Sequence, residues 1–320
     1  EPDARALAAM KRAGPAIRAL RLGDGGLARF HGGSAMEDGA LDQALALAGK
    51  RARGTRRLSA MGYERLAAGG VAVVLDAARG PEGAPHAAAS ALAFEMSAGA
   101  QRLVAGVGSG RGLGGDWPVA ARATAAHSAV EIAGVSSARL APAGFASGVL
   151  GRPLASGPSV VDAERTEDAQ GQWLLAEHDG YLRRFGLVVT RRLNLAPDGA
   201  ALRGEDIASA PSAEARARFD KVARDGGLAI AVRFHLPPGV EASAFEDRRG
   251  ARLVPPTGPA WRFRASGGRV ALSESVWLSG PDTPPEPTSQ IVVLARAEAY
   301  FGRVSWAFTR EPRAAQDAPR

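Results

Sequence analysis

Cysteine is absent from the 320 residues, and lysine occurs only three times, at Lys11, Lys50 and Lys221. The lack of cysteine excludes disulfides and thiolate metal sites, but it does not fix the cellular compartment. No run of about 18 uninterrupted apolar residues exists, so the sequence contains no candidate membrane-spanning helix. The chain also has neither a GxSxG nucleophile elbow nor a GKS or GKT phosphate loop.

The composition is that of a globular protein, with 46% hydrophobic and 23% charged residues. The net charge of +7 is carried almost wholly by arginine. This bias either reflects genomic base composition or suits an anionic polymer, because guanidinium groups pair bidentately with carboxylate and sulfate. The basic residues are scattered, and the sequence has no recognisable nucleic-acid module, so nucleic acid is not expected as a partner.

Strand patterns dominate from about residue 22 onward. Hairpins are predicted at 62–77 and 90–108, and a turn is predicted at 197–199 after a strand that includes Phe185, Leu187 and Val189. Alternation is clearest at 226–236 and continues at 260–265, 269–278, 289–298 and 303–310. Only 39–48 and 212–224 have helical spacing. These patterns predict an all-β fold, a large antiparallel β-sandwich.

The two ends of the chain differ from this pattern. Residues 1–21 have rough helical spacing that Gly14-Pro15 interrupts, and they include no signal peptide. We expect this segment to be the remnant of a helical region, and the chain to be a fragment or a processed product. The predicted domains are therefore 1–21 as linker, 22–310 as sandwich and 311–320 as a disordered tail.

The glycine-rich stretch 106–117 contains a formal GxGxxG match at 110–115. A dinucleotide site requires a helix directly after the glycines, within alternating strands and helices. Asp116-Trp117-Pro118 follows instead, so we interpret the stretch as a loop between strands. No cofactor is predicted.

The chain has only five histidines, which are the main candidates for chemistry. His86 precedes a predicted strand in "PHAAASALAFEM", where Leu92, Phe94 and Met96 alternate. His127 is predicted to share a strand face with Glu131. The remaining histidines are His31, expected to be structural, His178, in a polar turn, and His235, on the open face of its strand.

The linked segments "PHAAASALAFEMSAGAQRLVAGVGSG", "DWPVAARATAAHSAVEIAGVSSARL" and "EHDGYLRRFGLVVTRRLNLAPDGAALRGED" resemble the C-terminal half of heparinase II/III-like polysaccharide lyases, in the form common among alphaproteobacteria. The resemblance covers about 22–310. It implies a β "super-sandwich" that follows an N-terminal α/α-toroid, with the opening helix as the last piece of that toroid. It also implies β-elimination on uronic-acid polysaccharide, with a base, an acid and neutralisation of the substrate carboxylate.

The resemblance assigns roles to individual residues. His86 matches the first histidine of an H-x-H-x-D-type motif and would bind or neutralise the uronate, while its second histidine falls on Ala88. Members with a structural zinc use that second histidine, an acidic residue and a further histidine, which here are Ala88, Gly106 and His127. One imidazole cannot hold zinc, so no metal is predicted in this domain.

Further roles follow from the same resemblance. His127 and Arg122 are expected to face the cleft, with His127 as a second catalytic candidate. His178 and Tyr181 belong to a recurrent "HDGY" segment that is open to a substrate-binding or a structural role. Arg183 and Arg184 lie close to them in sequence.

Three functions remain open from the sequence. The first is the sandwich half of a lyase, inactive without its toroid, with an acidic polysaccharide and the missing toroid as partners. The second is a non-catalytic carbohydrate-binding or cell-envelope protein, favoured by Ala88 and Gly106. The third is a domain that serves as an interaction surface only. The resemblance also implies a periplasmic or envelope location.

Overall fold

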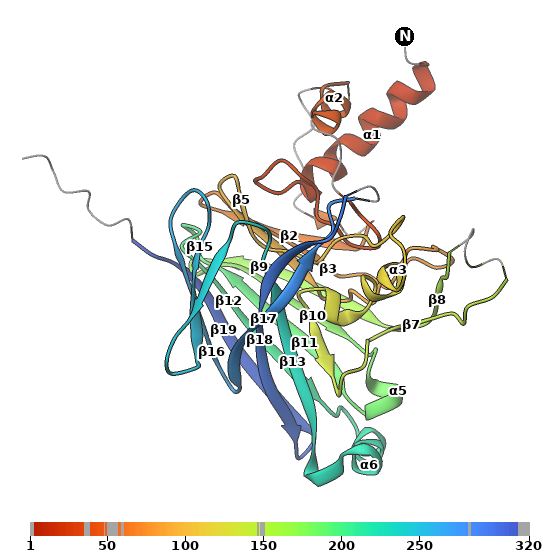
Figure 1. Cartoon of the computed structure of the whole chain (residues 1–320), viewed down its shortest axis with the longest axis vertical. Helices are drawn as coiled ribbons and strands as arrows, with labels where there is room; N and C mark the ends of the chain where they lie inside the picture. Colours follow the sequence, from red (N-terminus) through yellow and green to blue (C-terminus); the bar gives the residue numbers. More distant parts are fainter. Residues whose placement is uncertain are drawn as a thin grey trace, which may run out of the picture.

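Two antiparallel sheets packed face to face make up most of the chain (Figure 1). The computed structural model describes residues 3–34, 39–47, 49, 57–58, 61–145, 147, 151–280 and 283–312. A large hydrophobic core lies between the sheets and draws residues from strands of both. The all-β sandwich predicted from the sequence is confirmed.

The smaller sheet contains five strands in sequence order: β1 (Arg57–Leu58), β2 (Tyr63–Ala68), β3 (Val71–Asp76), β4 (Phe94–Ala98) and β5 (Gln101–Val104). Gly69 and Gly70 both have positive φ, of 52° and 79°, and form the turn of the first predicted hairpin. Both predicted hairpins are present. The second begins later than its alternation suggested, because Leu92 has a φ of 58° and belongs to the turn before β4.

The larger sheet contains twelve strands. These are β6 (Val130–Ile132), β9 (Val161–Asp168), β10 (Gly171–His178), β11 (Val188–Leu195), β12 (Ala201–Ser209), β13 (Gly227–His235), β14 (Glu241–Ala244), β15 (Gly250–Val254), β16 (Trp261–Ser266), β17 (Arg269–Trp277), β18 (Glu286–Glu298) and β19 (Phe301–Arg310). One path runs β14-β15-β16-β19-β12-β11-β10-β9, and β18 joins β19 to β13 and β17. A separate pair is formed by β7 (Arg139–Leu140) and β8 (Leu154–Ser156).

The helices lie around the sandwich, with α1 and α2 at one end and α6 at the other (Figure 1). They are α1 (Ala4–Leu20), α2 (Ala40–Leu47), α3 (Trp117–Ala120), α5 (Leu182–Phe185) and α6 (Ala213–Val222). The helical spacing at 39–48 and 212–224 thus predicted α2 and α6. Two predictions were wrong: α1 continues through Pro15, and Phe185 lies in α5, so the strand there begins at Val188.

No helix among the described residues is long and apolar enough to cross a membrane. The predicted disordered tail at 311–320 lies, from residue 313 on, outside the described residues.

Aromatic side chains fill the centre of the core. Trp306 stacks on Phe94 at a centroid distance of 5.5 Å, which brings β19 of the large sheet against β4 of the small one. Gly204 lies opposite Trp306 in the register, and a Cβ built there would meet the indole at 2.1 Å. A glycine is therefore needed on β12 for the indole to fit.

Candidate functional site

His86 lies in a turn at residues 85–86, ahead of the turn at 91–92 that leads into β4. The N–H of Ala88 donates to Nδ1 of His31 at 3.1 Å, and the N–H of Ala89 donates to the carbonyl of Arg122 at 2.9 Å. Ser90 donates its hydroxyl to the buried carboxylate of Asp76 at 2.6 Å. These bonds fix the backbone beside His86, and they give His31 the structural role expected of it.

The His86 ring is half-buried and reachable from solvent. Burial lowers its pKa below the ordinary value, and the charges of Arg111 and Arg122 lower it further. The imidazole is therefore neutral at pH 7. It can accept a proton or a hydrogen bond, whereas the neutralisation of an acidic ligand falls to the two arginines.

Arg122 connects His86 to a cleft on the side of the sandwich. Its Nε donates to the carbonyl of Ala87 at 2.7 Å, and its buried Nη2 has no hydrogen-bond partner among the described residues. Burial and the charge of Arg152 lower the pKa of Arg122. An unpartnered guanidinium nitrogen beside a second arginine favours an anion at this place.

The cleft has a volume of about 660 Å³ and is lined from α3, β7, β8 and α5, which lie along one side of the molecule (Figure 1). Of the described residues that line it, five are arginines and none is acidic. We call it the arginine cleft, after Arg122, Arg139, Arg152, Arg183 and Arg184.

None of these five arginines forms an ion pair with any residue that the structure describes. Arginines on the outer face of the large sheet differ. There Arg192 and Arg303 pair with Glu205, and Arg264 pairs with Asp247. A concave site that gathers positive charges without neighbouring carboxylates is typical of an anion-binding site.

His127 lies away from this surface. The residue comes directly after the 3-10 helix η1 (Thr124–Ala126), whereas the sequence predicted it to lie on a strand. It is only 2% exposed. Neither ring nitrogen has a hydrogen-bond partner among the described residues. Burial, together with the charges of His31, His235 and Arg29, lowers the pKa of His127 to about 3. The ring is neutral and out of reach of a polymer in this structure.

His178 and Tyr181 are each 1% exposed and hold backbone together. Nδ1 of His178 accepts from the N–H of Gly180 at 3.0 Å, and burial lowers the pKa of His178 to about 4. The Tyr181 hydroxyl lies within 3.1 Å of the carbonyls of Val130 and Val135. This geometry supports the structural role that the sequence left open for both.

His235 corrects an expectation about its strand. It was predicted on an open face, but it is 3% exposed because β13 is covered on both sides. Its Nδ1 lies 2.7 Å from the Ser275 hydroxyl, and its Nε2 lies 2.9 Å from the carbonyl of Ala125.

The positions that the family resemblance links to zinc do not form a metal site. Of Ala88, Gly106 and His127, only His127 has a side chain that can coordinate a metal. A Cβ atom built on Gly106 would already lie 3.1 Å from Nδ1 of His127. Arg29 places a buried cation there instead, donating to the Gly106 carbonyl at 2.9 Å. Among the described residues, no group of three or more histidines and carboxylates is arranged to hold a metal ion.

Of the predicted site residues, the structure therefore brings His86 and Arg122 together at an accessible surface. The other three, His127, His178 and Tyr181, are buried and do not reach this surface. The sequence analysis missed Arg111, Arg139 and Arg152. Arg139 and Arg152 lie on β7 and just before β8, short elements without a strong alternation, so no local signal marked them.

Comparisons with known proteins agree with the architecture. The family profile described as "Heparinase II/III-like, C-terminal" matches residues 50–307. A crystal structure of heparinase III superposes with a TM-score of 0.67 at 9% identity, over 99% of this chain and 50% of that one. The heparan sulfate lyase HepC from Pedobacter heparinus gives 0.64 at 13% identity, over 94% and 46%. At these identities the structural likeness concerns the fold alone.

A curated relative is more similar in sequence. "FtsZ-localized protein C" of Caulobacter vibrioides (strain NA1000 / CB15N) is 32% identical over 316 residues, which are 97% of this chain and 53% of that protein. The chain thus spans about half the length of the curated relative and of the lyases that it matches.

Proposed function

Because this chain belongs to the heparinase II/III-like C-terminal family, we propose that it binds an acidic polysaccharide in the arginine cleft without cleaving it. We place this activity in a larger protein of the cell envelope that works at the site of division. The name of the 32% identical relative supports the link to division. The observation that carries the binding role is the set of five arginines in the cleft, none of which has a carboxylate partner in the described part of the chain.

The accessible acid–base groups that the structure describes near the cleft are too few for cleavage. β-Elimination needs one group to remove a proton and one to protonate the leaving oxygen, both within hydrogen-bond reach. Among the described histidines near the cleft, His86 is accessible, while His127 and His178 are buried and neutral. Tyr181 is buried as well, and its pKa is raised by burial.

Charge reversal on α5 tests the binding role. Arg183 and Arg184 are exposed, so Arg183→Glu/Arg184→Glu should fold normally. Each reversal turns an attraction of up to about 1 kcal/mol into repulsion, so affinity for polygalacturonate or heparan sulfate should fall at least about tenfold. Affinity is measured by calorimetry at two salt concentrations, and wild-type binding should weaken at high salt.

The matched control is Lys11→Glu/Arg12→Glu, which makes the same change in charge on α1, at the end of the molecule opposite α6 (Figure 1). Both of these side chains are exposed. This variant should bind within about twofold of wild type, since surface charges far from a site act weakly at physiological salt. Equal losses in both variants would mean that net charge, and not the arginine cleft, drives binding.

A second candidate function is catalysis by the whole protein. The neutral His86 ring beside Arg111 and Arg122 favours it, because a neutral imidazole can act as a base while the arginines meet the enolate charge. The remaining groups would have to come from the rest of the protein.

His86→Ala separates the two functions. In the full-length protein, a lyase should lose about 10²–10⁴-fold in rate, the usual contribution of a general base. The rate is followed through the ultraviolet absorbance of the unsaturated product on several polyuronates. We expect no turnover by wild type and a small change in affinity for the variant; turnover that depends on His86 would decide for the lyase.

A further inference from the structure

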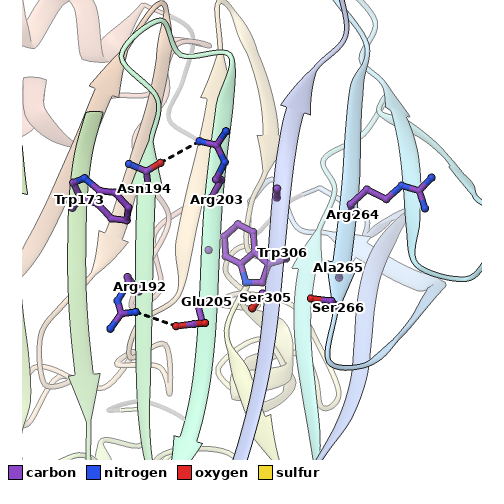
Figure 2. Close-up of a pocket in the computed structure, with 12 residues that line it drawn as sticks. Trp173, Arg192, Asn194, Arg203, Glu205, Arg264, Ala265, Ser266, Ser305 and Trp306 are labelled. Carbon is purple, nitrogen blue, oxygen red and sulfur yellow. Dashed lines mark hydrogen bonds and ion pairs between the residues drawn. The ribbon is translucent and has the colours of Figure 1, made fainter. Parts of the chain in front are cut away.

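The outer face of the large sheet carries a second hollow, whose lining shares no residue with that of the arginine cleft. It has a volume of about 500 Å³ and crosses β10, β11, β12, β19 and β16 (Figure 2). We call it the outer groove. Its outward-facing lining side chains are Trp173, Arg192, Asn194, Arg203, Glu205, Arg264, Ser266, Ser305 and Ala307.

The register arranges these side chains in two rows perpendicular to the strands. The first row is Trp173, Asn194, Arg203, Ala307 and Arg264, each directly opposite the next. The second row is Arg192, Glu205, Ser305 and Ser266. Four strand intervals of about 4.8 Å separate Trp173 from Arg264, so the first row is about 19 Å long.

Short side chains make the hollow. Ala307 and Ser305 on β19, with Ser266 on β16, lie between longer side chains on either side. The groove is therefore a shallow trough that runs across the strands and ends at an indole on one side and a guanidinium on the other (Figure 2).

Trp173 is the aromatic wall of this trough. Its Nε1 donates to Asp168 at 3.0 Å, which fixes the ring, and the side chain remains partly exposed. A second hollow of about 280 Å³, also lined by Glu164 and Thr166, lies against the same tryptophan. An indole with open space on two sides is available for stacking, and indoles gain binding energy from a flat apolar face.

The polar groups of the groove are held in place before any ligand arrives. Asn194 accepts from Arg203 at 3.3 Å, and Arg192 donates to Glu205 at 3.1 Å (Figure 2). Arg203 has no carboxylate partner among the described residues, in contrast to Arg192 and Arg264. Its charge is thus left for a ligand, and preorganised groups lower the entropic cost of binding.

We propose that the outer groove binds an acidic oligosaccharide lying across the strands, with one pyranose ring against Trp173 and a carboxylate at Arg203. Asn194, Glu205 and the serines would bond to sugar hydroxyls. Strand addition by a peptide does not fit, because the groove lies on the face of the sheet, where backbone groups are already paired. This surface is separate from the arginine cleft and does not depend on the function proposed there.

The test uses the Arg183→Glu/Arg184→Glu variant of the full chain as background, so that binding at the arginine cleft is suppressed. Adding Trp173→Ala should weaken binding of hexagalacturonate about tenfold, which corresponds to about 1.4 kcal/mol. Arg203→Ala should give a similar loss. Trp173→Phe, which keeps a stacking ring, should stay within about threefold.

Phe301→Ala is the matched control, because Phe301 is 49% exposed on β19 and lies outside the groove. It should bind as the background does, and neutral chitohexaose should bind all variants more weakly than hexagalacturonate. Unchanged binding by Trp173→Ala with an unchanged melting temperature would overturn the proposal. So would a dimer of the chain that Trp173→Ala dissociates, since a second copy would then cover the groove.

Discussion

Replacing Arg191 by methionine should lower the free energy of unfolding by about 3–5 kcal/mol, the usual effect of removing one partner of a buried ion pair. Arg191 on β11 is 0% exposed and lies directly opposite Asp206 on β12. Nε and Nη2 bind the two carboxylate oxygens at 2.6 and 3.0 Å. The substitution would leave the Asp206 carboxyl group in the core with Trp306 Nε1 as its one remaining side-chain donor among the described residues.

The loss extends beyond the pair, because Arg191 also ties the sheets together. Its Nη1 donates to the carbonyls of Leu92 and Ser128 at 2.7 and 2.8 Å. Leu92 belongs to the turn at residues 91–92 directly before β4 of the small sheet, whereas His86 lies in a separate turn at residues 85–86. Arg191 therefore holds the turn before β4 and the residue Ser128 to β11, through hydrogen bonds to backbone carbonyls that an apolar side chain cannot replace.

Urea denaturation of three variants measures this effect. Arg192→Met is the neighbouring control: its side chain is 51% exposed and pairs with Glu205, so it should cost less than about 1 kcal/mol. Arg191→Met/Asp206→Leu removes both charges and should recover part of the stability. A loss for Arg191→Met no larger than that for Arg192→Met would contradict the role of Arg191 as a buried tie.

The sequence predicted the sandwich because its hairpins are local. Gly69-Gly70 and the turn at 197–199 join strands whose alternation is regular, so turn chemistry and pattern agree. The sequence-based prediction was wrong where a short apolar stretch is compatible with both a strand and a helix. Phe185 continues a strand-like alternation, yet it packs from a single turn of helix that ends at Gly186, whose φ is 71°.

The candidate site was less predictable, because burial is decided by segments that are distant in sequence. His235 alternates as an outward residue would, but η1 and β17 cover it through Ala125 and Ser275. His127 matches the family position by sequence, whereas the charges that act on it come from His31, His235 and Arg29, which are distant in sequence. The arginine cleft collects arginines from 122 to 184, and only the fold shows that none of the five pairs with a carboxylate of the residues that the structure describes.

Acidification should unfold the protein through its buried histidines. The folded-state pKa values of His127, His178 and His235 are lowered to about 3, 4 and 4, against about 6.5 in the unfolded chain. Between pH 6.5 and 4 the unfolded state binds more protons, so stability is full above about pH 7 and falls as the pH drops. Each histidine should cost about 2 kcal/mol by pH 5, and together they approach the total stability of a typical domain.

His127→Leu isolates one of these contributions. The imidazole makes no hydrogen bond to the described residues, so leucine of similar size should leave stability at pH 7 unchanged or higher. At pH 5 the variant should retain about 2 kcal/mol more than wild type, measured by urea denaturation at both pH values. His86→Ala should not change the pH dependence comparably, because His86 is half-exposed. Equal acid sensitivity of His127→Leu and wild type would show that His127 is protonated in the folded state, and therefore reached by solvent, which would return it to the list of accessible acid–base groups.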